Sequence, residues 1–507
     1  MSRRRPLSLE QLRGGGEAFM REVSLEYYRA HAGLSETAAL QPIYERHANV
    51  LGPESLALAL DGFTSSAEGS EERRSSRLLL EWQVESHASR ALAGLDEQEI
   101  AWESSAMVQV ADGRQIPYQR AAIEIGNATD RRDRLAIDEA RARLVQSELA
   151  PMRLDRLQRE KDLTEELGIA GSYNQSFETL SGVSLSGLVS ECEAFLRDTQ
   201  PMWDDVLPEK LRTLGITVSE ATRADALALL RAAEFDGSFP QRDMEPAIRR
   251  QSLEMGIDPV AAGRIVFDTG EREGKHARAF CAPVRVPDEV YLVLRPHGGQ
   301  TDWRTLLHEL GHALHFAYTR GDLPFEFRWM GDNSVTESYA MLYDHLMQDD
   351  GWLRRYSSLG ATHTPRFLRA PGFEELHFLR RYCAKLIYKE RLYGGDVPWG
   401  ALPDLYVETL TAATTFRYHA ADAFVDVDPR YYSVRYLRAW QLQAVLNDVL
   451  VEKYNDDWYR NPAAGPWVIG TLFGEGQREL AGEIAERVAG KPLSFAPLIR
   501  TVEALLA

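Results

Sequence analysis

The stretch TDWRTLLHELGHALHF, residues 301–316, combines a helical pattern with three side chains that can act together on a metal ion. Leucines recur at three- and four-residue spacing, which predicts an amphipathic helix with one packed face. The packed positions are Leu306, Leu307, Leu310 and Leu314. His308 and His312 lie four residues apart, so on a helix their imidazoles point to the same side, one turn apart.

The chemistry of this H-E-x-x-H pattern is that of a zinc-activated water. Glu309 follows His308 at ~100° around the helix, where it can hold a water molecule bound to the ion and accept its proton. One zinc ion (Zn2+) suits this role because it lowers the pKa of bound water and polarises a carbonyl. With 12 histidines and 76 acids in 507 residues, chance predicts roughly 0.04 such patterns. The alternative is a packed helix whose histidines are ordinary core or surface groups.

A catalytic zinc ion needs a third protein ligand. Residues 315 and 318 are His and Tyr, where the extended metzincin pattern would require Gly and His. The segment GDNSVTESYAMLYDHLMQ begins with an Asn333/Ser334 capping signal and continues helically, which makes Glu337 the predicted ligand. Glu326 and Asp332 are rival ligands in an apparent loop, and His315 is expected to be a packed histidine.

The rest of the chain predicts a mainly α protein. Helical periodicity dominates, and short strands are expected in GRIVFDTG, ARAFCAPVRV and EVYLVLRP, which place a small β-sheet directly before the H-E-x-x-H helix. A β-hairpin is expected at 106–125, with a type I′ turn at Asp112-Gly113. The long helical pattern after residue 130 should bend or break near Pro151.

Composition narrows the class of protein. Hydrophobic residues make up 44% and charged residues 26% of the chain, as in folded globular proteins. The net charge of −18 argues against nucleic acid or an anionic membrane as partner. No secretory signal or membrane span is recognisable, and three widely spaced cysteines fit a reducing compartment. The expected location is the cytoplasm.

Three features resemble the thimet oligopeptidase and oligoendopeptidase F family of zinc peptidases. They are HELGHALH preceded by TDWRTLL, Glu337 with 24 residues between it and His312, and the tyrosine-rich segment DPRYYSVRYLRAW at 428–440. The resemblance runs from about residue 274 to about Gly476, where TLFGEGQREL is similar to the family's C-terminal end. It implies a large helical two-lobed body with a deep substrate channel, here divided into an N-terminal lobe at 1–195 and a catalytic lobe at 196–507.

The resemblance also implies roles for residues outside the metal site. Tyr432 and Tyr436 share a helical face and are expected to stabilise the oxyanion of the reaction, whereas Tyr431 would point elsewhere. The family's histidine before these tyrosines is missing, and His419, 13 residues before Tyr432, is the nearest candidate. The middle tyrosine of the family pattern is Val434 here.

The family resemblance further implies that the strand EVYLVLRPHGG lies at the sheet edge and pairs with the backbone of the substrate. The residues predicted to bind substrate are Leu294, His297, Gly298 and Gly299. An ordinary buried strand and turn is the alternative.

These observations predict a zinc-dependent oligopeptidase that cuts internal bonds of short, unfolded peptides. A helical metallocarboxypeptidase, which removes C-terminal residues one at a time, uses a similar motif and remains open. So does a catalytically silent peptide-binding protein on the same scaffold, although binding alone has no need of the base Glu309.

Overall fold

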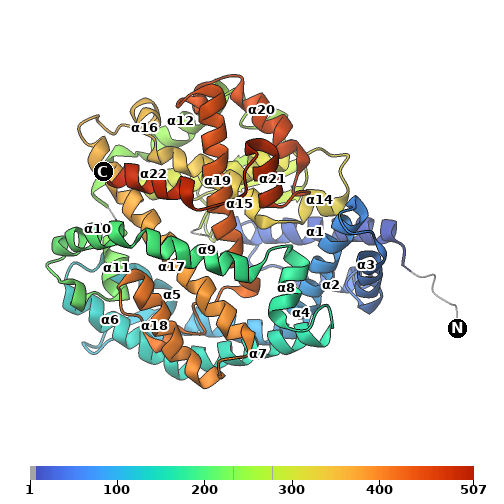
Figure 1. Ribbon diagram of the computed structural model, residues 1–507, viewed down its shortest axis with the longest axis horizontal. Coiled ribbons are helices and arrows are strands. Elements are labelled where there is room, and N and C mark those ends of the chain that lie inside the picture. Colours follow the sequence, from blue (N-terminus) through green and yellow to red (C-terminus); the bar gives the residue numbers. More distant parts are fainter. Residues whose placement is uncertain (1–6, 232, 277) are drawn as a thin grey trace. The chain divides into compact units, whose positions relative to one another are not determined.

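A computed structural model describes residues 7–231, 233–276 and 278–507 (Figure 1). The described chain is mainly helical with two small sheets, which confirms the expectation of a mainly α protein with a small sheet before the H-E-x-x-H helix. None of its helices combines the length and the apolar character needed to cross a membrane.

The chain forms two compact units, each made of segments that are distant in sequence. The first contains residues 1–87, 234–368 and 438–498, and the second contains 88–233, 369–437 and 499–507. The expected boundary at residue 195 falls inside the second unit.

The helices and strands of each unit have the following bounds. The first unit has α1 (Leu9–His31), α2 (Leu40–Arg46), α3 (Pro53–Ser65), α12 (Gln241–Glu254), β3 (Ile265–Asp268), β4 (Phe280–Arg285), β5 (Glu289–Val293), α13 (Gln300–Tyr318), α14 (Phe325–Trp329), α15 (Asn333–Asp344), α16 (Asp350–Tyr356), α20 (Ala464–Thr471) and α21 (Ala481–Ala489). The second has β1 (Met107–Gln109), β2 (Gln115–Pro117), α5 (Tyr118–Asn127), α6 (Arg131–Leu144), α7 (Ala150–Glu166), α8 (Tyr173–Ser181), α9 (Leu185–Asp198), α10 (Gln200–Thr213), α11 (Arg223–Leu229) and α18 (Leu402–Thr414). Residues of both units occur in α4 (Glu71–Ser105), α17 (Thr364–Gly394), α19 (Tyr432–Tyr454) and α22 (Ala496–Leu506).

The three expected strands before the H-E-x-x-H helix form one sheet in the order β3-β5-β4. β5 pairs parallel with β3 and antiparallel with β4, so both of its hydrogen-bonding edges are occupied. The expectation that this strand forms the edge of the sheet is therefore wrong. Its apolar residues Val290, Leu292 and Val293 are buried, as a central strand requires.

The hairpin is shorter than expected. β1 and β2 pair antiparallel around Asp112-Gly113, but the sequence after Pro117 forms α5 instead of the second half of a long strand. Only Gly113 of the two turn residues has a positive φ, so the turn is not type I′. Ala121 and Ile125 lie four residues apart on the buried face of α5, which is a helical spacing.

The long helical pattern is not broken near Pro151, because helical residues continue without interruption from residue 131 to residue 166. α6 passes through one turn of π-helix at Val145–Leu149 into α7, and Pro151 lies in the first turn of α7. Proline has no N–H to donate to the preceding turn, and the regular α-helical bonding changes to a π-helical turn directly before it.

The helix α13 forms the centre of the first unit, packed against β4, β5 and α15. Its leucines 306, 307, 310 and 314 are fully buried, as the pattern predicts. Gly311 faces α15: a Cβ atom there would lie 2.6 Å from the Cα of Ala340. The missing side chain thus allows the two helices to approach closely.

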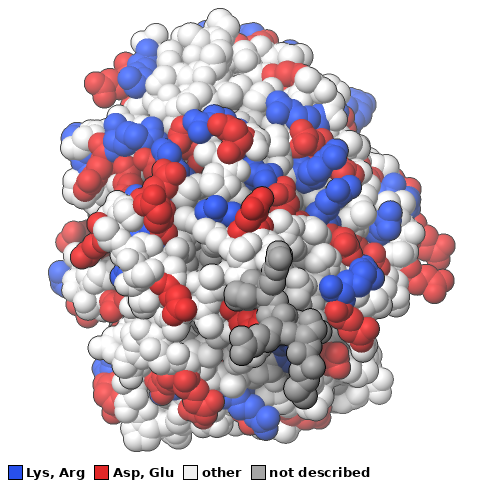
Figure 2. All heavy atoms as spheres, turned by 90° about the vertical axis from the view of Figure 1, so that its right-hand side faces the viewer, with Lys and Arg blue, Asp and Glu red and all other residues white. Residues whose placement is uncertain are grey.

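Basic and acidic side chains are interspersed on the face drawn in Figure 2, with no large basic patch visible on it. This distribution agrees with the net charge of −18.

Candidate metal centre

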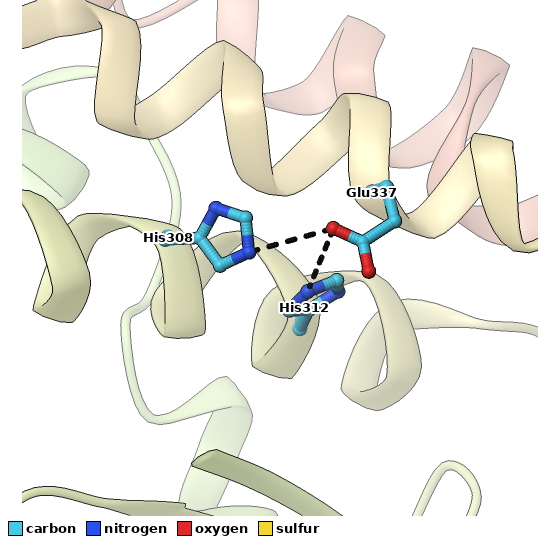
Figure 3. Close-up of side chains that lie close together, drawn as sticks. All are labelled: His308, His312 and Glu337. Atoms are coloured by element: carbon cyan, nitrogen blue, oxygen red, sulfur yellow. Dashed lines mark ion pairs between the residues drawn. The ribbon is translucent and has the colours of Figure 1, made fainter. Parts of the chain in front are cut away.

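His308 and His312 of α13 and Glu337 of α15 converge on one point (Figure 3). The Oε2 atom of Glu337 lies 3.5 Å from the Nε2 of His308 and 3.8 Å from the Nε2 of His312. One ligand atom from each residue lies within 4.8 Å of the other two. In the described part of the chain, this is the group of three such side chains able to hold a metal ion.

These separations fit tetrahedral zinc. With bonds of 2.0–2.1 Å to nitrogen and oxygen, two ligand atoms of a tetrahedral site are about 3.3 Å apart. The observed 3.5 and 3.8 Å between the carboxylate and each imidazole are within about 0.5 Å of this value. The two imidazole nitrogens lie within 4.8 Å of each other and would have to approach to bind one ion. Two imidazoles and one carboxylate are also a donor set typical of catalytic zinc, which leaves a fourth position for water or substrate.

Each histidine is oriented by a hydrogen bond at its other ring nitrogen. The Nδ1 of His308 lies 2.8 Å from the Oδ2 of Asp344, and the Nδ1 of His312 lies 2.9 Å from the Oγ1 of Thr336. Asp344 also contacts the Nδ1 of His345 through its other oxygen, at 2.5 Å. Such partners fix the ring and leave the Nε2 lone pair directed at the ion.

The pKa values of the two histidines follow from burial and from these contacts. Burial acts to lower the pKa of His308, but Asp344 and Glu337 raise it to about 10. Burial lowers the pKa of His312 to about 4. A metal ion would compete with the proton on His308, because a ligating imidazole must be neutral.

Glu309 lies beside this cluster with the properties of a general base. Burial raises its pKa to about 7, against the lowering effect of the His308 charge and of a hydrogen bond with the backbone of Cys281 in β4. A base is most effective when its pKa is near the working pH. The contact with β4 thus positions the Glu309 side chain, and burial raises its pKa.

The rival ligands have other partners. The carboxylate of Glu326 is fully buried and accepts hydrogen bonds from Arg13 and Ser75. Asp332 caps α15 by accepting from the backbone of Ser334, and it accepts from Ala481 as well. It is the capping residue, one position before the Asn333/Ser334 signal. His315 is fully buried against Tyr339 and Phe473, as expected of a packed histidine.

The predicted substrate-binding residues have structural explanations in the turn before α13. The backbone of Leu294 donates to Asp268 and extends the pairing with β3. The backbones of His297 and Gly298 donate to the carboxylate of Asp302 in the first turn of α13. Gly298 and Gly299 have φ values of +86° and +90°, which favour glycine whether or not a substrate approaches. A substrate role for these four residues stays a prediction.

Tyr432, Tyr436 and His419 belong to the second unit. The rings of Tyr432 and Tyr436 are 4.9 Å apart on α19, which confirms that they share a face. Tyr431 is buried and its hydroxyl contacts Asn174 and Lys389. The Nε2 of His419 lies 3.0 Å from Asp138.

The catalytic roles expected for Tyr432, Tyr436 and His419 stay predictions. The contact with Asp138 gives His419 a structural role in either case, as one member of a charged group with Arg141 and Asp422.

Sequence reasoning missed Asp344 and Thr336. Both had a signal: Thr336 directly precedes Glu337, and Asp344 follows it by seven residues, or about two helical turns, which places both acids on one face of α15.

In comparisons with known proteins, no family model and no curated protein matches this chain. The family resemblance therefore rests on the motif residues and their spacing.

Proposed function

We propose that this protein is a zinc-dependent oligopeptidase that hydrolyses internal bonds of short, unfolded peptides. The observation that carries the proposal is the convergence of His308, His312 and Glu337 beside Glu309, a half-buried carboxylate whose pKa is raised to about 7. The two-lobed body, the deep channel and the preference for short peptides come from the family resemblance and are part of the proposal.

The residues present would divide the chemistry among them. His308, His312 and Glu337 would hold the zinc ion, which when bound supplies a Lewis acid that polarises the scissile carbonyl and acidifies water. The Glu309 carboxylate would take a proton from the attacking water and pass it to the departing amine. Asp344 and Thr336 would keep the two imidazoles in the ligating tautomer.

The test is peptide cleavage by the zinc-loaded chain and by Glu309→Gln. A library of peptides blocked at both ends is incubated with each, and products are identified by mass. Loss of a general base typically costs about 10²–10⁴-fold in rate, so Glu309→Gln should lose at least about 100-fold while retaining one zinc ion. Glu72→Gln, at an exposed position of the same unit, is the matched control and should cleave like the parent.

Each outcome distinguishes the proposed oligopeptidase from one alternative function. Internal cleavage of blocked peptides supports the proposal, and cleavage only of peptides with a free C-terminus would favour a carboxypeptidase. Equal turnover by the parent and Glu309→Gln, or peptide binding without turnover, would contradict the proposed mechanism.

A further inference from the structure

The second unit contains a groove that the proposed peptidase chemistry does not use. It has a volume of about 610 Å³ and is lined mainly by residues of α9, α17 and α18. Its apolar lining is entirely aliphatic, with Leu196, Ile387, Leu405 and Ala412 among the residues. A groove of this volume is in the range that binds small molecules.

Arg380 of α17 lines the groove and is almost completely buried, with 1% of its surface exposed. Its guanidinium donates to the carbonyls of Ala413 and Leu196, at 2.7 and 3.0 Å, and to the side chains of Thr199 and Gln200. All four acceptors are neutral. No carboxylate of the described residues forms an ion pair with this side chain.

This arrangement holds the guanidinium without an ion-pair partner, and the carboxylate of Asp204 acts on its charge only from beyond Gln200. The two carbonyls belong to the last turns of α18 and α9, where the helix dipole provides only a partial negative charge. Burial lowers the pKa of Arg380 to about 10. An arginine has five N–H donors, so with four engaged one N–H of Nη2 is left for a further acceptor.

The charges around the groove favour an anion. Arg197 lines it next to Leu196, is exposed, and forms no ion pair with any described residue. Arg391 lines it 11 residues along α17 from Arg380, about 16 Å or three turns away on the same face, and pairs with Asp396. Glu408 is the acidic lining residue, and no ion pair joins it to the arginines in the described chain. The positive charge is conspicuous in a chain whose net charge is −18.

We propose that this groove binds a small monocarboxylate with an aliphatic tail. The carboxylate lies at the Arg380 and Arg197 end, where a planar guanidinium matches its two oxygens. The tail lies along Leu196, Ile387 and Leu405. One buried cation matches the single charge of a carboxylate, whereas a phosphate dianion would carry excess charge into the groove.

The experiment is titration calorimetry of the full chain with sodium octanoate. The comparison compounds are 1-octanol, which has the tail without the charge, and acetate and inorganic phosphate, which have charge without the tail. Saturable 1:1 binding of octanoate is expected, with much weaker binding of the other three. The peptidase substrates are absent, so the result is independent of the proposed function.

Two variants locate the site without disturbing the buried Arg380. Ala412→Trp, at an exposed lining position, fills the groove and should abolish octanoate binding. Arg197→Gln removes an exposed charge and should weaken binding roughly two- to fivefold. Arg132→Gln, an exposed arginine of α6 in the same unit without an ion pair to a described residue, is the control and should bind like the parent.

The proposal is overturned by absence of saturable octanoate binding to the folded chain, by 1-octanol binding as tightly as octanoate, or by undiminished binding to Ala412→Trp. Circular dichroism of each variant confirms that the helical fold is intact. Tighter binding of phosphate than of octanoate would also contradict the proposal, because it would show an inorganic anion site without a role for the aliphatic wall.

Discussion

Replacing Asp344 by Asn should weaken zinc binding without removing a zinc ligand. The Asp344 side chain is 14% exposed, and its Oδ2 lies 2.8 Å from the Nδ1 of His308. Burial acts to raise its pKa, but His345 and His308 hold the pKa well below the usual value, so the carboxylate is charged. Asparagine keeps the shape and one acceptor oxygen but removes the charge.

The size of the effect follows from the hydrogen bond. A bond to a charged group contributes about 1.5–3 kcal/mol and a neutral one about 0.5–1.5 kcal/mol, so the loss is about 1 kcal/mol. That difference corresponds to roughly a fivefold weaker zinc affinity. Asparagine also no longer fixes the tautomer of His308, and loss of such a partner typically weakens metal binding by about 10–100-fold. We expect the dissociation constant of Asp344→Asn to rise by about tenfold.

The assay is competition for zinc between the protein and a chromogenic chelator. Asp350→Asn is the matched control, because it makes the same chemical change at an exposed position whose partner is Arg354. The control should bind zinc like the parent. An Asp344→Asn variant that binds zinc as tightly as the parent would refute the orienting role of Asp344.

Further predictions concern helix packing and pH. Gly311→Ala places a Cβ 2.6 Å from the Cα of Ala340, so it should destabilise the chain by about 1–3 kcal/mol and weaken zinc binding, measured by urea unfolding and chelator competition. Gly14→Ala in α1, where a Cβ meets no atom within 4 Å, should do neither, and equal behaviour of the two variants would contradict the close approach of α13 and α15. Burial lowers the pKa of His377 to about 3, so the unfolded chain binds a proton that the folded chain does not, and the stability from this residue is lost as pH falls below about 6.5. When the pH falls from 6.5 to 5, the free energy of unfolding of the parent should therefore drop by about 2 kcal/mol more than that of His377→Phe, as measured by urea unfolding. Identical pH profiles of the two proteins would contradict a neutral buried imidazole.

The candidate metal centre could be predicted because its geometry is mostly local. His308, Glu309 and His312 lie within two turns of one helix, and helical periodicity fixes their relative directions. Glu337 lies on another helix, and it reaches the site because α13 and α15 pack closely at Gly311. Its place in the site was therefore harder to predict. The sequence identifies that glycine but not the neighbour it faces.

The wrong predictions concern segments whose structure depends on the strands or helices they pack against. The alternating residues after Pro117 fit a strand, yet their buried face has helical spacing and packs in the cluster with Val108 and Ile137. The position of β5 in the centre of its sheet depends on β3 and β4, which are separated from it by turns of different length. Strand order is set by such tertiary contacts, and a single strand's composition does not specify it.

The central claim is that one zinc ion is held by two imidazoles and one carboxylate, and X-ray absorption at the zinc edge tests it most directly. For the chain loaded with one equivalent of zinc, we expect nitrogen and oxygen neighbours at about 2.0–2.2 Å with the outer-shell scattering of two imidazoles, and one fewer oxygen neighbour in Glu337→Ala. Sulfur at about 2.3 Å, a single imidazole, or an unchanged spectrum in Glu337→Ala would contradict the account.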